Sequence, residues 1–239
     1  MRRSWFFVLS LAVVLVLSAC QPPAFLQGEM PDDGPPVATT PAAAQRFAEK
    51  VAAAGERAVE TKRLNITVTQ KEVTSFLNIG SQVAQQLQDT YGVSSLKELQ
   101  QLQQQQGLAR AAGLPDWVKT LQQAQENLGV DLPDLSLAVR VKDPEVYFRG
   151  NGQIIVRGYG QVLGLREPLR LVLAPRAAKG ELVLDFVEGT LGPVSVPEGL
   201  VDLVGKGLAR LILAGSDYVQ VSKIEVSGGS LTLRGRYLK

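Results

Sequence analysis

The chain has 239 residues, with 25 basic and 23 acidic side chains, no histidine and a single cysteine. A net charge of +2 argues against nucleic acid as a partner, because nucleic-acid-binding domains concentrate basic residues on one surface. The lack of histidine and the lone cysteine remove the commonest metal ligands, the commonest general base and any disulfide within the chain.

Residues 1–19 predict a secretory signal that is cleaved before Cys20. Arg2 and Arg3 give a basic start, an apolar run follows from Trp5 to Leu17, and Leu-Ser-Ala-Cys closes the segment. The run is shorter than the roughly 20 apolar residues of a transmembrane helix, which favours a signal over an uncleaved anchor helix. The closing tetrapeptide resembles the bacterial lipobox, whose cysteine receives a diacylglyceryl group. We therefore expect a lipid-anchored protein on the extracytoplasmic face of a membrane of the cell envelope, with no net charge after cleavage.

Residues 20–41 are rich in proline, glycine, aspartate and threonine, and this composition is typical of a disordered spacer. Residues 42–239 are expected to form a single domain. Its first element is a helix over about 41–62, because Pro41 suits the first helical position and Thr40 can cap it.

The next segment combines a short strand with helices. Leu64 to Val68 alternates apolar and polar residues, which predicts a half-buried strand. Thr69 and Glu72 then form a capping box for a helix that ends near Gly92. Residues of about 94–128 are rich in glutamine and are expected to form a helical insert, whose glutamines are interpreted as a solvated face rather than a binding surface.

From Leu135 the hydrophobic period changes to two, and five consecutive strands are predicted as far as Phe186. Asp143-Pro144 separates the first two strands, and Gly150–Gly152 and Ala178–Gly180 supply later turns. A capping box at Ser195 starts a helix to about Ala214, and two final strands flank Gly228-Gly229. The predicted class is α+β, with one curved antiparallel meander sheet wrapped around one or two long amphipathic helices.

Two glycines, Gly158 and Gly160, lie on the apolar face of one predicted strand. Both remove side chain from the same inner surface. Tight packing of a helix on the sheet explains this pattern, and so does a slot that accepts an acyl chain; tight packing is the favoured explanation.

The run Asp143–Ile154 resembles a hairpin of the LmeA-like phospholipid-binding lipoprotein family. Thr67–Glu72, Gly192–Pro197 and Ile224–Leu233 are similar to further segments of that family. The resemblance implies a tubular lipid-binding-like domain with an apolar groove for acyl chains and no catalytic residues. The insert at about 94–128 is longer than the family pattern.

We therefore expect a protein that binds phospholipid or fatty acid, palmitate among the acyl chains, without cofactor, metal or nucleic acid; a protein partner is not indicated. No G-x-S-x-G, Walker or H-E-x-x-H motif occurs, so an enzyme is not expected. The alternative is a non-catalytic scaffold or interaction lipoprotein with a filled core. Lipid attachment is expected at Cys20, and the acyl-chain lining at Val73, Phe76, Leu77, Val156, Leu171, Leu184, Leu200, Val204, Leu208 and Leu211.

Overall fold

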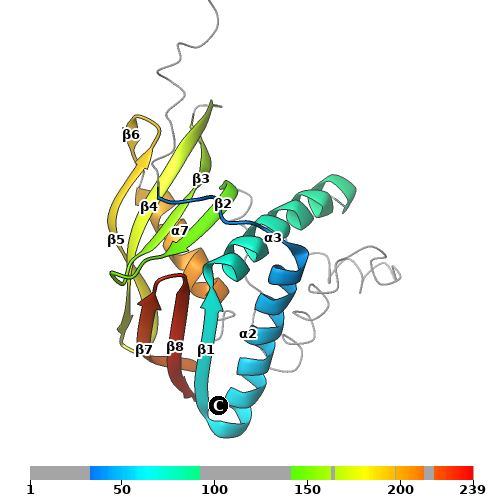
Figure 1. Ribbon diagram of the computed structural model, residues 1–239, viewed down its shortest axis with the longest axis vertical. Helices are drawn as coiled ribbons and strands as arrows, with labels where there is room; N and C mark the ends of the chain where they lie inside the picture. Colours follow the sequence, from blue (N-terminus) through cyan, green and yellow to red (C-terminus); the bar gives the residue numbers. More distant parts are fainter. Residues whose placement is uncertain (1–32, 92–140, 163–164, 197, 213–217, 239) are drawn as a thin grey trace, which may run out of the picture.

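The protein is described by a computed structural model (Figure 1), which covers residues 33–91, 141–162, 165–196, 198–212 and 218–238. Within these ranges the chain forms three helices and eight strands in two antiparallel sheets, and the α+β class is confirmed. Cys20, the helical insert of about 94–128 and the strand expected from Leu135 lie outside the described residues.

The larger sheet is a meander in which consecutive strands are neighbours. It contains β2 (Lys142–Phe148), β3 (Ile154–Val162), β4 (Leu165–Ala178), β5 (Glu181–Leu191) and β6 (Val194–Ser195). Its β2–β3 and β4–β5 turns fall where they were predicted, whereas Asp143 and Pro144, expected to separate two strands, lie inside β2 at a bulge. Gly152 closes the β2–β3 turn with φ 86°, and Lys179 and Gly180 close the β4–β5 turn with φ 52° and 86°.

The smaller sheet has the order β1-β8-β7, with β1 (Arg63–Thr69) beside β8 (Ser230–Tyr237) and β7 (Val219–Ser227) at its other edge. The single sheet expected from the sequence is therefore wrong: the final hairpin pairs with β1 instead of extending the meander. Two backbone contacts tie the sheets together. Gly229 N–H donates to the carbonyl of Phe148 at 2.8 Å, and Val221 N–H donates to that of Gly180 at 2.6 Å.

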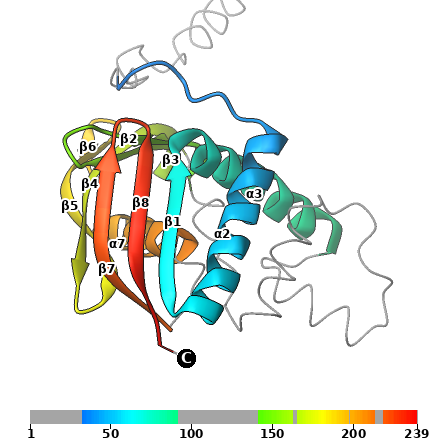
Figure 2. The ribbon, with the colours of Figure 1, turned by 60° about the horizontal axis from the view of Figure 1, so that its bottom comes forward.

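Helices α2 (Pro41–Thr61) and α3 (Gln70–Tyr91) start at the predicted caps. The Thr40 hydroxyl accepts a hydrogen bond from Ala43 N–H at 3.2 Å. Thr69 N–H donates to Glu72 Oε2 at 2.9 Å, and Glu72 N–H donates to the Thr69 hydroxyl at 3.3 Å, which confirms the capping box. Figures 1 and 2 show α2 standing beside β1, and Figure 1 shows α3 starting beside β2 and then running away from the sheet.

Helix α3 closes the outer edge of β2 with polar side chains spaced by four residues. Gln70, Thr74 and Asn78 contact backbone groups of alternate β2 residues. Phe148 N–H donates to Gln70 Oε1 at 3.4 Å, Val146 N–H donates to the Thr74 hydroxyl at 2.9 Å, and Asn78 Nδ2 donates to Pro144 O at 2.6 Å. Four helical residues rise about 6 Å and two strand residues about 6.6 Å, so the two rows stay in register. This edge of β2 pairs with no other strand of the described residues, and its backbone groups are thereby satisfied.

One continuous core joins both sheets and the three helices. Helix α7 (Glu198–Ile212) is seen behind the larger sheet in Figure 1 and behind the smaller one in Figure 2, and its buried Val204 and Leu208 belong to this core. We call the sheet side that faces this core the inner face. Phe47 of α2 and Phe76 of α3 meet within it, with ring centroids 4.8 Å apart.

Candidate functional site

The residues predicted to line an acyl-chain groove are brought together, but as packed core. Seven of them are buried and Leu184 is half-buried against the same cluster. The buried members are Val73, Phe76, Leu77, Val156, Leu171, Val204 and Leu208. Leu200 and Leu211 lie on α7, and their side chains are outside the described part of the chain.

Neighbouring groups fill the space that side chains would need at the two inner-face glycines. A Cβ at Gly158 would lie 2.8 Å from both the Lys142 carbonyl oxygen and Val141 Cγ1, because β2 bulges toward it at Asp143, whose φ is 49°. A Cβ at Gly160 would lie 2.9 Å from Leu191 Cδ1. Close packing by β2, by Val141 before it and by Leu191 of β5, rather than by a helix on the sheet, therefore accounts for both glycines, and neither leaves a slot.

An apolar surface of the inner face does reach solvent at β5. Phe186 pairs with the fully buried Leu173 of β4, so its side chain points to the inner side of the sheet. It is nevertheless 46% exposed. A Cβ at Gly189 would lie 3.0 Å from the Phe186 ring and 2.7 Å from Leu171 Cδ2. The absence of a side chain at Gly189 therefore leaves room for the ring beside the core. We call Phe186, Gly189 and Leu171 the β5 rim.

The opposite face of the larger sheet, the outer face, carries a second and smaller apolar cluster. Tyr147, Ile155 and Val172 are cross-strand neighbours on β2, β3 and β4, and all three are at most 4% exposed. Val37 packs on them. The cover comes from residues 33–40, which run across the sheet from β4 to the start of α2 (Figure 1).

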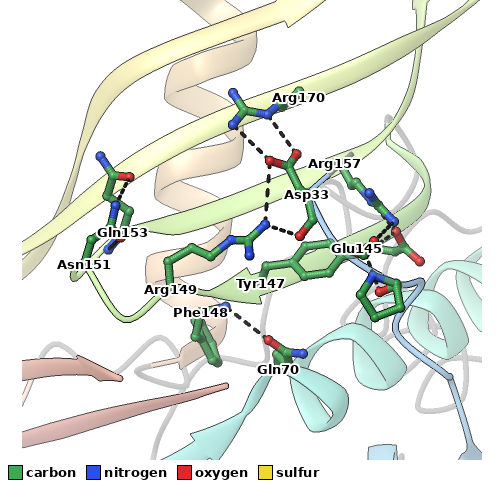
Figure 3. Close-up of polar contacts among 12 residues, drawn as sticks. Asp33, Gln70, Glu145, Tyr147, Phe148, Arg149, Asn151, Gln153, Arg157 and Arg170 are labelled. Carbon is green, nitrogen blue, oxygen red and sulfur yellow. Dashed lines mark hydrogen bonds and ion pairs between the residues drawn. The ribbon is translucent and has the colours of Figure 1, made fainter. Parts of the chain in front are cut away.

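Arginines and carboxylates surround this cluster, as Figure 3 shows. Arg157 and Arg170 lie directly opposite each other on β3 and β4. Asp33, which is 7% exposed, accepts hydrogen bonds from Arg170 Nε at 2.8 Å and Nη2 at 3.0 Å. Glu145 Oε2 accepts one from Arg157 Nε at 2.5 Å. The hydrogen bond with Asp33 raises the pKa of Arg170, so this guanidinium stays charged.

The backbone of residues 33–37 is held at several further points. Arg149 Nη2 donates to the Asp33 carbonyl, and Val37 N–H donates to Glu145 Oε1 at 3.1 Å. The Tyr147 hydroxyl lies 3.2 Å from the Pro35 carbonyl and 2.9 Å from Glu145 Oε2, and shares its one proton between them. Burial and the hydrogen bond to Glu145 both raise the pKa of Tyr147 far above its usual range, so it stays a donor.

These contacts correct the spacer expected over residues 20–41: its last part, residues 33–40, lies against the domain. We call residues 33–37 the strap. The sequence carries a signal for its docking. Val146-Tyr147-Phe148, Ile154-Ile155-Val156 and Leu171-Val172-Leu173 are apolar triplets, and a strand with three consecutive apolar residues is buried on both faces at that point.

A pocket of about 400 Å³ lies beside the strap, between the β2–β3 and β7–β8 turns. Asp33, Gln70, Arg149, Gly150 and Gly228 are among its lining residues. Arg149 Nε is buried and has no hydrogen-bond partner among the described residues. Because the Asp33 carboxylate shares the lining with Arg149, the pocket has no net excess of positive charge.

None of the described helices combines the length and the apolarity that crossing a bilayer requires. Comparison with models of known protein families gives no match to the chain. Comparison with curated proteins gives no match either. The assignment of function therefore depends on the residues and contacts described above.

Proposed function

We propose that this chain is a bacterial lipoprotein of the cell envelope, anchored through lipid on Cys20, whose domain binds the acyl chains of phospholipid or fatty acid. The ligand is membrane lipid, and the protein acts without catalysis or cofactor. In this proposal the two sheets together form the curved wall that wraps around α7 and the long helices α2 and α3. The lipobox and the resemblance to LmeA-like lipoproteins support it.

The exposed Phe186 is the observation that carries the proposal. An aromatic side chain on the inner face of a sheet normally completes the core, since burying it is worth about 1.5–3 kcal/mol. Here the ring continues the line of Leu171 and Leu173 and then meets solvent at the β5 rim. An acyl chain laid against this rim would extend the core outward. Each methylene buried there contributes about 0.8 kcal/mol, so five contribute about 4 kcal/mol, which is the free energy of millimolar binding.

Lipid uptake by the unanchored protein tests the proposal. The mature chain with Cys20→Ser would be purified from bacteria, extracted for lipid mass spectrometry and titrated with a fluorescent fatty acid. Phe186→Ser should weaken binding about tenfold or more, because it removes apolar contact area. Val59→Ser is the matched control: Val59 is 37% exposed and belongs to α2, and this helix stands across the molecule from β5 (Figure 1). No copurified lipid and no uptake, or equal binding by both variants, would refute acyl-chain binding at the β5 rim.

The anchor has a separate test. Mass spectrometry of the membrane-extracted protein should show Cys20 as the first residue, modified with diacylglycerol and further acyl chains. Replacing Cys20 by serine should prevent lipidation and release the domain from membranes. An unmodified Cys20 in membrane-extracted protein would contradict the anchor whatever the domain binds.

A scaffold lipoprotein with a filled core is the second candidate function. The close packing at Gly158 and Gly160 favours it, because Val141 and Leu191 occupy the space that a slot would need. In this case a partner protein would bind the surface of the domain, including the glutamine-rich insert. Deletion of residues 94–128 separates the two candidates: loss of a bound partner with unchanged lipid uptake supports the scaffold.

A further inference from the structure

The strap lies in a groove on the outer face of the larger sheet. Its walls are charged and its floor is apolar. At one end Asp33 sits in the fork of Arg170, and four residues later Val37 rests on Tyr147, Ile155 and Val172. The groove thus binds an acidic side chain and a β-branched side chain that lie four residues apart.

The middle of the strap suits this groove because it has few backbone N–H groups that need a hydrogen-bond acceptor. Pro35 and Pro36 have no N–H groups, and proline restricts the chain to extended conformations before it docks. The groove provides donors for the carbonyls: Tyr147 for Pro35 and Arg157 for Gly34, the latter at 3.4 Å. Less conformational entropy is lost on docking than a glycine–serine linker would lose.

The strap is held differently from the rest of the fold. Residues 33–40 form no strand and pair with no sheet edge. Of the strap's side chains only Val37 packs into an apolar cluster, and that cluster is separate from the main core. Opening of such a segment breaks its own contacts and leaves the sheets intact.

We propose that the outer face of β2–β4 is a docking site for an extended Asp-x-x-x-Val peptide, that the chain's own residues 33–37 are its ligand, and that they dock and release without unfolding of the domain. The docked strap shortens the tether. Twelve residues separate Cys20 from Asp33, which span at most about 45 Å, whereas release as far as Thr40 allows about 70 Å. This consequence rests on the lipidation of Cys20 proposed above; the docking itself does not.

Hydrogen exchange of the unanchored mature chain tests the docking. The Val37 N–H, which is bonded to Glu145, should exchange at least about tenfold faster than the amides of β3, because strap opening is local. Asp33→Asn should speed its exchange a further tenfold to hundredfold, as expected for loss of a charge-assisted hydrogen-bonded pair. Amides of β3 and β4 should not change.

Arg176→Gln is the matched control. Arg176 also lies on β4, and two of its nitrogens donate to the carboxylate of Asp185. This pair is solvent-exposed and lies away from the strap. The substitution should alter exchange at neither place. Equal acceleration of Val37 and the β3 amides in Asp33→Asn would overturn the proposal, because the strap would then be an inseparable part of the fold. Unchanged Val37 exchange in that variant would overturn the recognition of Asp33.

The tether length is measured on vesicles. Cys20 is the only cysteine of the chain, so once it is lipidated a Glu181→Cys variant can be labelled at one site. Energy transfer from this dye to acceptor lipids should fall when Asp33→Asn is added, because the domain moves farther from the bilayer. Unchanged transfer in a variant whose strap exchanges fast would refute the change in tether length. Failure of the protein to associate with vesicles would instead refute the anchor.

Discussion

Arg157 and Arg170 face each other across β3 and β4, and each is neutralised by a different part of the chain. Glu145 of β2 pairs with Arg157, whereas Arg170 pairs with Asp33 of the strap and with Glu188 of β5. Like charges directly opposite each other destabilise a sheet, so Glu145 and Glu188 are part of what keeps β3 and β4 paired. Both belong to the sheet itself, so each arginine keeps a carboxylate partner when the strap is released.

The Glu145–Arg157 pair should contribute more to stability than an exposed pair of the same sheet. Their side chains are 17% and 8% exposed, against 45% and 54% for Asp185 and Arg176. Glu145→Gln should lower the free energy of unfolding by about 3 kcal/mol, because it removes the charge opposite a buried guanidinium. Asp185→Asn should cost much less, because solvent screens an exposed pair. Urea unfolding of both variants measures the difference, and equal losses would show that burial does not strengthen the Glu145 pair.

The Thr74 hydroxyl should be one of the most sensitive polar groups in the fold. It is fully buried, accepts from Val146 N–H and donates to the Val146 carbonyl at 3.3 Å. Thr74→Val keeps the shape but leaves two buried backbone groups unsatisfied, which should cost about 2–4 kcal/mol. Thr67→Val is the control, since its hydroxyl pairs with Thr232 in solvent and valine suits a strand. Denaturant unfolding in which both variants lose the same stability would contradict the role of Thr74 at the β2 edge.

Local signals in the sequence predicted most of the elements, whereas long-range pairing remained hidden. The Thr40 cap, the Thr69–Glu72 box and the turn at Gly180 depend on neighbouring residues, and all three are present. The pairing of β1 with β8 joins segments more than 160 residues apart, and no local pattern distinguishes it from pairing with the meander.

The polar face of α3 and the strap were missed for a related reason. Polar residues on a helix are ordinarily read as solvent-facing, but Gln70, Thr74 and Asn78 serve the backbone of β2. The strap has the composition of a disordered linker, and only the apolar triplets of the strands that it covers indicate that it docks. Tertiary contact overrides composition at both places.

Three glycines should respond to alanine in a fixed order. At Gly158 the new Cβ would meet a backbone oxygen 2.8 Å away, which cannot move freely, so a loss of about 2–3 kcal/mol is expected. At Gly160 the closest group is the flexible end of Leu191, so a loss of only about 1 kcal/mol is expected. Gly150 has open space and no left-handed φ, so alanine there should be neutral or stabilising by up to about 1 kcal/mol. Midpoints of urea unfolding give the order; a neutral Gly158→Ala would show that β2 does not close on this position.

Glu72 should give the protein part of its stability at neutral pH and lose that part in acid. Burial alone would raise the pKa of Glu72, but hydrogen bonds from Lys50 and from Thr69 N–H outweigh it and hold the pKa below its usual value. A carboxylate with a lowered pKa in the folded state stabilises that state fully above the unfolded value, about 4.3. The contribution disappears as the pH falls through the lower, folded value.

Glu72→Gln should therefore lower the free energy of unfolding by about 1–2 kcal/mol at pH 7, where the ionised cap and its pair with Lys50 are lost. The difference from the wild type should shrink as the pH falls below the unfolded value of about 4.3, because the wild-type carboxyl then becomes protonated. Glu49→Gln, an exposed change on α2, is the control and should leave the pH profile unchanged. Thermal unfolding across this range is the measurement. A difference between Glu72→Gln and the wild type that stays constant down to pH 2 would show that the ionised carboxylate is not what stabilises the start of α3.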